Sequence, residues 1–363
     1  LSVYGAPADS GGNGAWGIDP QNGGSEGGVS AYTAAAHKYV SEANDIALKW
    51  SGAFDNKTFL VDASVGWHHQ RSARLPSDGS EIGSQQGLSG LPSTQWQRTS
   101  PVVHSITDFV SLPAGTCEEA QFDADGNLTR GPQCPASTYF SGGPDFIDDS
   151  NLDRYTAKII ATKLFQGLGH HVVKAGVDFE QMSYQHTKAY SGHVRFSENG
   201  SGTAFNDSRG YGFLVGPDTA VIQDKQVASS TSSSVGAFIQ DSWNLLDKVT
   251  LNLGVRYDSQ YMFGDDGKLG LALPTMFAPR VGIVYDITQQ GRSKIYANFA
   301  RYYESIPLDI VDRGFPGEAQ VGSRHRSYAN GGAQFNPDGS PINNCDPRDP
   351  AQATGICQDD AAR

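Results

Sequence analysis

The feature that most constrains this sequence is an alternation of apolar and polar residues in segments of about ten residues. The clearest segment runs from Thr58 to Gln70, and its apolar residues are Phe59, Val61, Ala63, Val65 and Trp67. Because successive side chains of a β-strand point to opposite faces, such a segment predicts a strand with one apolar side. The segments come in pairs, which indicates four hairpins, at residues 45–70, 155–184, 232–258 and 277–303.

The connections between these strands alternate between short and long. Short turns follow Phe54, Gln166, Trp243 and Asp286, whereas long loops are expected at residues 71–154, 185–231 and 259–276. Residues 1–44 and 304–363 are expected to be further extracellular segments, with a short helix within 30–44. Tight turns on one side and long loops on the other are typical of outer-membrane barrels, whose long loops are extracellular.

The composition is compatible with a barrel in a membrane. The chain of 363 residues is 38% hydrophobic, and it has no run of about 18 apolar residues, so a transmembrane helix is excluded. A barrel strand turns only alternate residues toward lipid, so a mean hydropathy of -0.42 does not argue against membrane insertion. We therefore predict an all-β fold, an antiparallel transmembrane β-barrel, with the soluble β-sandwich as the alternative that alternation also fits.

The polar side of the strands carries charged residues without an apolar cover. A large barrel would turn this side into a water-filled lumen. The candidate lumen residues, which could line a path or hold a plug by hydrogen bonds and ion pairs, are His68, Lys174, Asp178, Glu180, Arg256 and Arg280. The other interpretation is that these residues are merely solvated in a wet interior.

The charge and the cysteines set further limits. A net charge of -12 and the lack of a basic stripe argue against nucleic acid as a partner. The four cysteines form two close pairs in loops, Cys117 with Cys134 and Cys345 with Cys357. This arrangement favours two disulfides in an oxidising compartment. Zinc is the rival interpretation, but neither pair has the CxxC spacing of a zinc site.

One loop has the pattern of a cation site. Asp123, Asp125 and Asn127 place oxygen ligands at short spacing around a glycine, as in a calcium loop, but no closing Glu follows at EF-hand distance. The alternative is an ordinary solvated turn. Calcium in the loops is the one cofactor that the sequence suggests.

Two segments resemble a known family. The residues from Val235 to Trp243 (VGAFIQDSW) and from Val249 to Asp258 (VTLNLGVRYD) resemble the barrel of TonB-dependent outer-membrane receptors, and within them the Oar-like branch. Residues 277–285 and 294–303 fit the next hairpin of the same pattern. The resemblance covers about residues 231 to 304, and it is specific for the class of barrel rather than for the ligand.

The resemblance implies that the chain is part of a larger barrel of 22 strands in the cell outer membrane. We expect the chain to be a fragment, with the plug domain, the TonB-contacting segment and the remaining strands outside it. The implied function is movement of an unidentified extracellular ligand across the membrane, with energy supplied by the TonB complex through parts of the protein absent from this chain. The implied partners are thus outer-membrane lipid, TonB and the ligand, and no enzymatic activity is expected.

Two other functions remain open at this level. The first is a structural or adhesive surface barrel whose disulfide-linked loops contact other cells or matrix. The second is a secreted β-sandwich that binds or cleaves carbohydrate, which would be soluble without detergent. The acidic composition slightly favours a cationic or metal-bearing ligand for a transporter.

Overall fold

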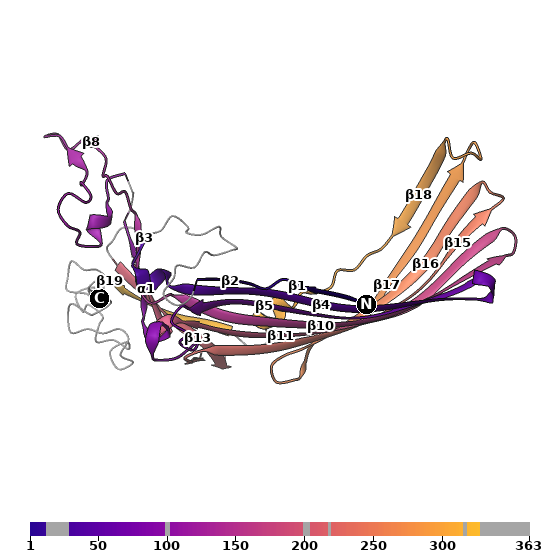
Figure 1. Ribbon diagram of the computed structural model, residues 1–363, viewed down its shortest axis with the longest axis horizontal. Coiled ribbons are helices and arrows are strands. Elements are labelled where there is room, and N and C mark those ends of the chain that lie inside the picture. Colours follow the sequence, from indigo (N-terminus) through magenta and orange to yellow (C-terminus); the bar gives the residue numbers. More distant parts are fainter. Residues whose placement is uncertain (12–28, 99–101, 199–203, 217–218, 315–317, 327–363) are drawn as a thin grey trace.

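The computed structural model describes residues 1–11, 29–98, 102–198, 204–216, 219–314 and 318–326. Ten strands form one antiparallel sheet in the order β1-β4-β5-β10-β11-β15-β16-β17-β18, with β2 beside β1 on the edge of β4. Apart from the edge strands β1 (Ser2–Gly5) and β2 (Ala8–Gly11), these are β4 (His37–Phe54), β5 (Phe59–Pro76), β10 (Phe146–Gln166), β11 (His170–Tyr190), β15 (Gln226–Leu245), β16 (Val249–Phe263), β17 (Leu269–Asp286) and β18 (Lys294–Ala300). In the described residues they form an open, curved wall (Figure 1).

The turns from β4 to β5, β10 to β11, β15 to β16 and β17 to β18 lie at one end of this wall, at the right of Figure 1. The connections after β5 and β11 are long and lie at the other end, whereas the connection between β16 and β17 spans only residues 264–268. The turn between β4 and β5, Asp55–Lys57, holds its three residues at φ of 50°, 51° and 68°. The turn between β15 and β16 places Leu246 and Asp247 at φ of 55° and 52°. Two consecutive left-handed residues match the right-handed twist of the flanking strands, which is why such tight turns join antiparallel neighbours.

The strands are longer than the sequence predicts, and three expected boundaries are wrong. Most of the loop expected at 259–276 is strand, because β16 continues to Phe263 and β17 begins at Leu269. The helix expected within 30–44 is limited to α1 (Tyr32–Ala35), since β4 begins at His37. Residues 2–11, expected in a loop, contain β1 and β2. Tertiary pairing overrides local pattern at these places, because a hydrogen-bonded ladder continues where the apolar alternation has stopped.

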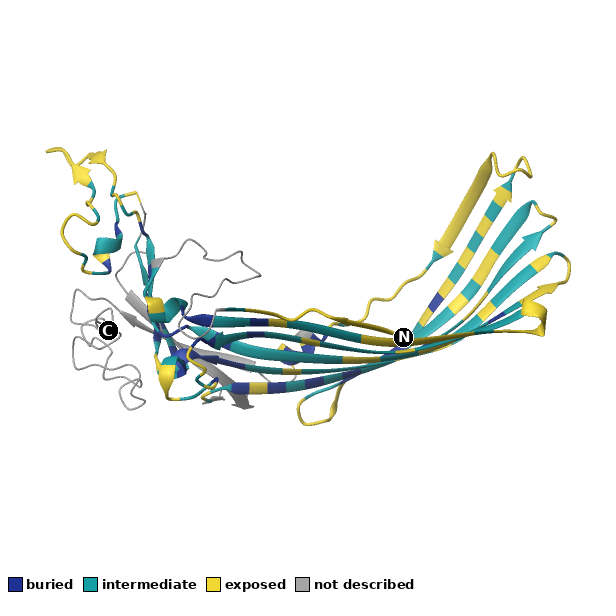
Figure 2. Ribbon diagram, viewed as in Figure 1, coloured by how far each residue is buried: buried dark blue, intermediate teal, exposed yellow. Residues whose placement is uncertain are grey.

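The outward face of the wall is an apolar belt. Large apolar side chains are about half exposed there, for example Val177 (51%), Ile239 (53%) and Val281 (50%). Figure 2 shows the alternation of exposed and less exposed positions along these strands. The belt includes Ile46, Leu48, Trp50, Val65, Tyr155, Ile159, Val177, Phe179, Val235, Ile239, Leu253, Val255, Phe277, Val281 and Ile283. So much contiguous exposed apolar surface indicates contact with lipid, because soluble proteins rarely expose such patches.

The belt ends at a defined height on each strand. On β11 the outward residues Val177 and Phe179 are followed by Gln181, Ser183, Gln185 and Thr187. On β10 the outward residue after Tyr155 toward the loops is Asp153, whose Oδ1 accepts a hydrogen bond from Trp67 Nε1 at 3.0 Å. Tryptophan with its ring in the belt and its N–H at the polar edge is typical of a membrane interface. The strands therefore continue well beyond the hydrocarbon on the loop side.

Beyond the wall, the loops build a second, seven-stranded sheet. Its order is β14-β13-β12-β6-β9-β3, with β19 paired to β13. The strands are β3 (Val29–Ser30), β6 (Ser93–Gln97), β9 (Thr138–Gly142), β12 (Val194–Glu198), β13 (Ala204–Gly216), β14 (Thr219–Ile222) and β19 (Glu318–Arg326). A separate hairpin of β7 (Gln121–Phe122) and β8 (Leu128–Arg130) lies farther out, at the upper left of Figure 1.

The remaining helical elements are short. The helix α2 spans Leu308–Gly314, and the 3-10 turns are Gly87–Gly90, Ile106–Asp108 and Ser191–His193, besides the turn at Asp55–Lys57. Among the described helices, none has the length and apolar character to cross a membrane.

Candidate functional site

The candidate site lies on the inward face of the wall, opposite the belt. All six residues predicted for the lumen have this parity, because each alternates with belt residues on its own strand, as Arg256 does between Val255 and Tyr257. The structure thus brings polar side chains from β5, β11, β16 and β17 to one surface. Their roles toward a ligand remain predictions.

The centre of this surface is the guanidinium of Arg256. Its Nη1 and Nη2 donate to Oδ1 and Oδ2 of Asp178 at 3.0 and 2.9 Å, and its Nε donates to Asp258 at 2.9 Å. Paired hydrogen bonds of this kind fix the orientation of both groups and are stronger than neutral ones. Asp178 belongs to β11 and Arg256 to β16, so the contact spans three strands.

This bridge depends on the residue beneath it. Gly236 on β15 is paired with Asp178 on one side and with Asp258 on the other. A Cβ at Gly236 would collide with Arg256 Nη2 and would lie 2.5 Å from Asp178 Oδ2. A Cβ here would displace the ends of both side chains, so the bridge uses the space that a glycine leaves in the middle of an otherwise regular strand.

The other predicted lumen residues form smaller contacts around this centre. Glu180 on β11 pairs with Arg154 on β10, and His68 Nδ1 lies 2.8 Å from Oδ1 of Asp45. The guanidinium of Arg280 lies over the ring of Tyr302, 5.0 Å from its centroid. Lys174 lies between Thr162 and Gln240 in register and forms no ion pair within the described part of the chain.

A cavity of about 270 Å³ opens beside the Arg256 network. Four of the six predicted residues line it, whereas His68 and Lys174 do not. Its lining includes Asp178, Glu180, Arg256, Asp258, Gln260, Arg280, Tyr302, Tyr303 and Glu304. Sequence reasoning missed Asp258, although it stands two residues after Arg256 and so shares its face. It also missed Tyr302, Tyr303 and Glu304, because no periodic signal indicates that the chain after β18 returns to the wall.

This returning segment, residues 304–314, is here called the strap. It was expected to be extracellular loop, but it lies against the inward face, where Leu308 and Val311 pack on Met262 beside Leu152, Met182 and Tyr184. Gln260 holds the strap in both directions, since its Nε2 donates to Ile306 O at 3.0 Å and its Oε1 accepts from Ile306 N at 2.9 Å. Apolar burial and the hydrogen bonds from the Gln260 side chain to the backbone of Ile306 together hold this segment inside the curve of the wall.

A buried ionic cluster adds to this attachment above the belt. Lys188 Nζ lies 3.2 Å from Oδ2 of Asp312, and both side chains are 5% exposed. His186 lies between Asp312 and Asp148, at 3.0 and 3.3 Å. Burial alone would lower the pKa of His186, but the hydrogen bonds with Asp148 and Asp312 outweigh it and raise that pKa. Burial alone would raise the pKa of the Asp312 carboxyl, but His186 and Lys188 outweigh it and lower that pKa.

The predicted loop sites have separate outcomes. Cys117 and Cys134 form a disulfide, whereas Cys345 and Cys357 lie outside the described residues. Asp123 accepts from the backbone N–H of Asp125 and Asn127 at 3.0 and 2.8 Å, so its carboxylate organises the β7–β8 turn. Within the described residues no group of three His, Cys, Asp or Glu side chains could hold a metal ion. Calcium at Asp123, Asp125 and Asn127 stays a prediction.

An antiparallel wall with a lipid-facing belt outside and a charged surface inside defines an outer-membrane β-barrel protein. Comparison with known proteins agrees: the chain belongs to the outer membrane beta barrel domain family, whose model matches residues 16–273. It is 41% identical over 369 residues to the TonB-dependent transporter Oar of Myxococcus xanthus. This alignment covers 99% of the chain and 34% of the relative, so the chain spans about a third of that relative's length.

The solved structures that match this chain have lower sequence identity to it. The ferric-catecholate import receptor Fiu of E. coli K12 aligns with 73% of this chain and 33% of its own, at 10% identity and a TM-score of 0.39. The outer-membrane transporter YddB of Escherichia coli aligns with 78% of this chain and 29% of its own, at 16% identity and a TM-score of 0.41. The sequence match to the curated relative confirms the Oar-like resemblance and the outer-membrane location, and the belt excludes the secreted β-sandwich.

Proposed function

We propose that the chain forms part of the barrel wall of a TonB-dependent transporter or receptor, which moves a ligand across the outer membrane with energy supplied through TonB. The observation that carries this proposal is the two-faced wall, with lipid contact outside and the Arg256 network with its cavity inside. The identity to a protein named as a TonB-dependent transporter supports the same function. In the whole protein we propose closure into a barrel of 22 strands around a plug domain.

The inward surface suits passage rather than chemistry. Its cavity presents carboxylates of Asp178, Glu180 and Asp258 together with the guanidinium groups of Arg256 and Arg280. Such a surface can hold a plug or a polar ligand by many exchangeable hydrogen bonds. We assign no catalytic residue, and the net charge of -12 of the chain slightly favours a cationic or metal-bearing ligand.

Energy coupling can be tested without knowing the ligand. Ser234 lines the lumen cavity, so the Ser234→Cys variant of the full-length protein reports on access to it. In living cells we expect a membrane-impermeant maleimide to label this cysteine several-fold faster when TonB is present and the inner membrane is energised. A protonophore or deletion of TonB should abolish the increase, because the lumen opens only when work is done on it.

The control is Asp265→Cys in the exposed loop between β16 and β17, which should label at one rate in all conditions. The parent protein serves as the blank for its native cysteines. Equal labelling of Ser234→Cys with and without TonB would contradict energy coupling. That result would favour the second candidate, a structural or adhesive barrel, which the second sheet and the disulfide-linked hairpin beyond the wall also suit.

A further inference from the structure

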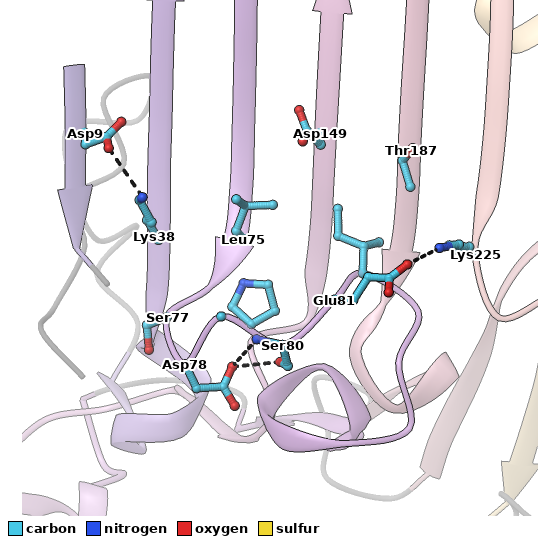
Figure 3. A pocket seen from close by; sticks show the side chains of 13 residues that line it. Asp9, Lys38, Leu75, Ser77, Asp78, Ser80, Glu81, Asp149, Thr187 and Lys225 are labelled. Carbon is cyan, nitrogen blue, oxygen red and sulfur yellow. Dashed lines mark hydrogen bonds and ion pairs between the residues drawn. The ribbon is translucent and has the colours of Figure 1, made fainter. Parts of the chain in front are cut away.

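A second cavity, of about 750 Å³, lies on the outside of the wall and has no part in the proposed transport path. Leu75, Asp149 and Thr187 line it from β5, β10 and β11 (Figure 3). Each has the outward parity of the belt, since the registers of β5 with β10 and of β10 with β11 run without a shift from the belt to these residues. The cavity, here called the outer pocket, therefore faces the membrane surroundings and not the lumen.

The outer pocket is closed by residues 77–90, which fold back onto the outside of the wall. Ile82 anchors this loop, because it packs on Ile147 and Ala189, and the three side chains are 7%, 0% and 1% exposed. Asp78 fixes the turn, since its carboxylate accepts from Ser80 N at 3.0 Å, Ser80 Oγ at 2.7 Å and Leu88 N at 2.8 Å. The pocket is thus preformed, and its volume lies in the range of about 300–1,000 Å³ typical of small-molecule sites.

The charges of the outer pocket are arranged in opposite pairs at its two sides. Lys38 pairs with Asp9 at 3.3 Å on one side, and Lys225 pairs with Glu81 at 2.6 Å on the other (Figure 3). The lysine side chains are 40% and 38% exposed, so these pairs are accessible to solvent and weak. A ligand hydroxyl can exchange with them and gain charge-assisted hydrogen bonds to ammonium and carboxylate.

The charged side chains that line the outer pocket indicate which charge its ligand should carry. The lining holds four carboxylates, of Asp9, Asp78, Glu81 and Asp149, against the two ammonium groups of Lys38 and Lys225. An acidic lining repels a bare phosphate, while the lysines and the Arg71 fork on Asp149 compete with a cation for the carboxylates. An uncharged polyol meets neither obstacle.

The height of the outer pocket indicates where such a polyol comes from. Asp149 is six positions beyond Tyr155 on β10 (155 − 149), and Thr187 is eight positions beyond Phe179 on β11 (187 − 179). At about 3.3 Å per residue and a strand tilt of about 40°, the pocket lies roughly 15–20 Å above the belt. The polar interface of a bilayer adds only about 5–8 Å on each side. The pocket is therefore at the level of sugars carried by glycolipids of the outer leaflet.

We infer that the outer pocket binds uncharged sugar units in the headgroup of outer-leaflet glycolipids, through Lys38, Lys225 and their carboxylate partners. The bound glycolipid would fasten residues 77–90, and with them the base of the second sheet, to the membrane surface. This role is independent of ligand transport through the lumen.

The test compares two glycolipid probes with the purified full-length protein in detergent. One probe is lipopolysaccharide with a complete core oligosaccharide, and the other is lipid A without core sugars. We expect the complete form to bind at least about tenfold more tightly, as measured by titration with a fluorescent derivative. Thr187→Trp, which fills the pocket without removing a charge, and the double variant Lys38→Ala/Lys225→Ala should both abolish this preference.

The matched control is Lys49→Ala/Lys158→Ala, which removes two lysines of β4 and β10 on the inward face and should keep the preference. Equal affinity of the wild type for the two probes would overturn the inference, as would a preference that survives Thr187→Trp. Loss of binding on chelation of divalent cations would overturn it in favour of metal-bridged phosphates. Free core oligosaccharide is a further probe. If it binds more tightly than intact lipopolysaccharide does, the proposal that the sugar belongs to a membrane lipid would be overturned.

Discussion

At the scale of single residues, the arrangement of the inward surface depends on the missing side chain of Gly236. Gly236 leaves room for the Arg256 guanidinium to cross β15 and reach Asp178, and any side chain would force the two charged groups apart. The charged pair is partly exposed, with side-chain exposures of 25% and 31%, so its value is in fixing geometry more than in stability. The contact between Arg256 and Asp178 therefore depends on Gly236, which has no side chain.

We expect Gly236→Ala to destabilise the barrel by about 0.5–1.5 kcal/mol, because its Cβ displaces the ends of the Arg256 and Asp178 side chains and breaks their paired hydrogen bonds. The measurement is reversible urea unfolding in detergent or lipid. Gly282→Ala is the control, since a Cβ there meets its nearest neighbours at 3.7 and 3.8 Å, which is ordinary contact. Similar losses for the two variants would show that the Arg256 bridge does not need the glycine.

At the scale of elements, the strap is held on the inward face by a cluster of ionisable side chains. The groups that face its Asp312 are His186 and Lys188 from β11, with Asp148 of β10 on the far side of the imidazole. Arg313 follows directly and is exposed. Tryptic cleavage after Arg313 can therefore report how firmly the strap is seated.

Removing the anion should release the strap. We expect Asp312→Ala to speed cleavage after Arg313 by roughly tenfold, because Lys188 and His186 lose their buried partner. Cleavage after Arg130, in the exposed β7–β8 hairpin, provides the internal reference for protease activity. An unchanged ratio of the two cleavages would mean that the apolar contacts of Leu308 and Val311 alone hold the strap.

The same ratio should depend on pH. His186 has a raised pKa, so its contribution is full below the ordinary value of 6.5 and is lost as the pH rises through the raised value. Asp312 has a lowered pKa, so its contribution is present above its ordinary value of 3.8 and is lost as the pH falls through the lowered one. The strap should be held most firmly between these limits. The alkaline loosening should disappear in His186→Gln, and its persistence would assign the effect to another group.

The disulfide belongs to a different element and should act locally. Cys117 and Cys134 are 17 residues apart, and closing a loop of that length is worth about 3 kcal/mol to the structure that it encloses. We expect mild reduction to speed proteolysis within residues 117–134 while the urea midpoint of the barrel stays unchanged. A parallel drop in the midpoint would show that the hairpin supports the wall.

At the scale of the whole molecule, stability depends on which face of the wall meets which solvent. The outward residues of β11 cross from hydrocarbon to water between Phe179 and Gln181. A charge on this face should cost free energy according to its depth, since lipid offers no hydrogen bonds. The inward face does not contact lipid, so no such gradient is expected there.

We expect Val177→Arg to lower the free energy of unfolding in lipid vesicles by about 2–4 kcal/mol, and Gln181→Arg by no more than about 1 kcal/mol. The two residues share a strand and a face, so the difference isolates depth in the membrane. If Gln181→Arg proved as costly as Val177→Arg, the upper edge of the belt would lie higher than the polar residues indicate. If neither were costly, the outward face would not contact lipid.

The two-faced hairpins could be predicted from the sequence, because alternation with a period of two assigns every residue of a paired strand to one side. It therefore placed Asp178, Glu180, Arg256 and Arg280 on the inward face, and residues 235–243 and 249–258 indicated the class of barrel. It failed where both sides of a strand have the same character, polar in the outer part of β11 and apolar at residues 269–276 of β17, and so gave strands that are too short.

Which of these residues contact one another follows from the folded sheet and could not be predicted from the alternation. The bridge from Arg256 to Asp178 joins positions 78 residues apart, and the contact of Asp312 with Lys188 joins positions 124 residues apart. The return of residues 77–90 to the outside of the wall and of residues 304–314 to its inside likewise depends on the sheet being present. Such contacts leave no periodic trace in the sequence, because their partners are set by the register and curvature of the whole sheet and not by neighbours along the chain.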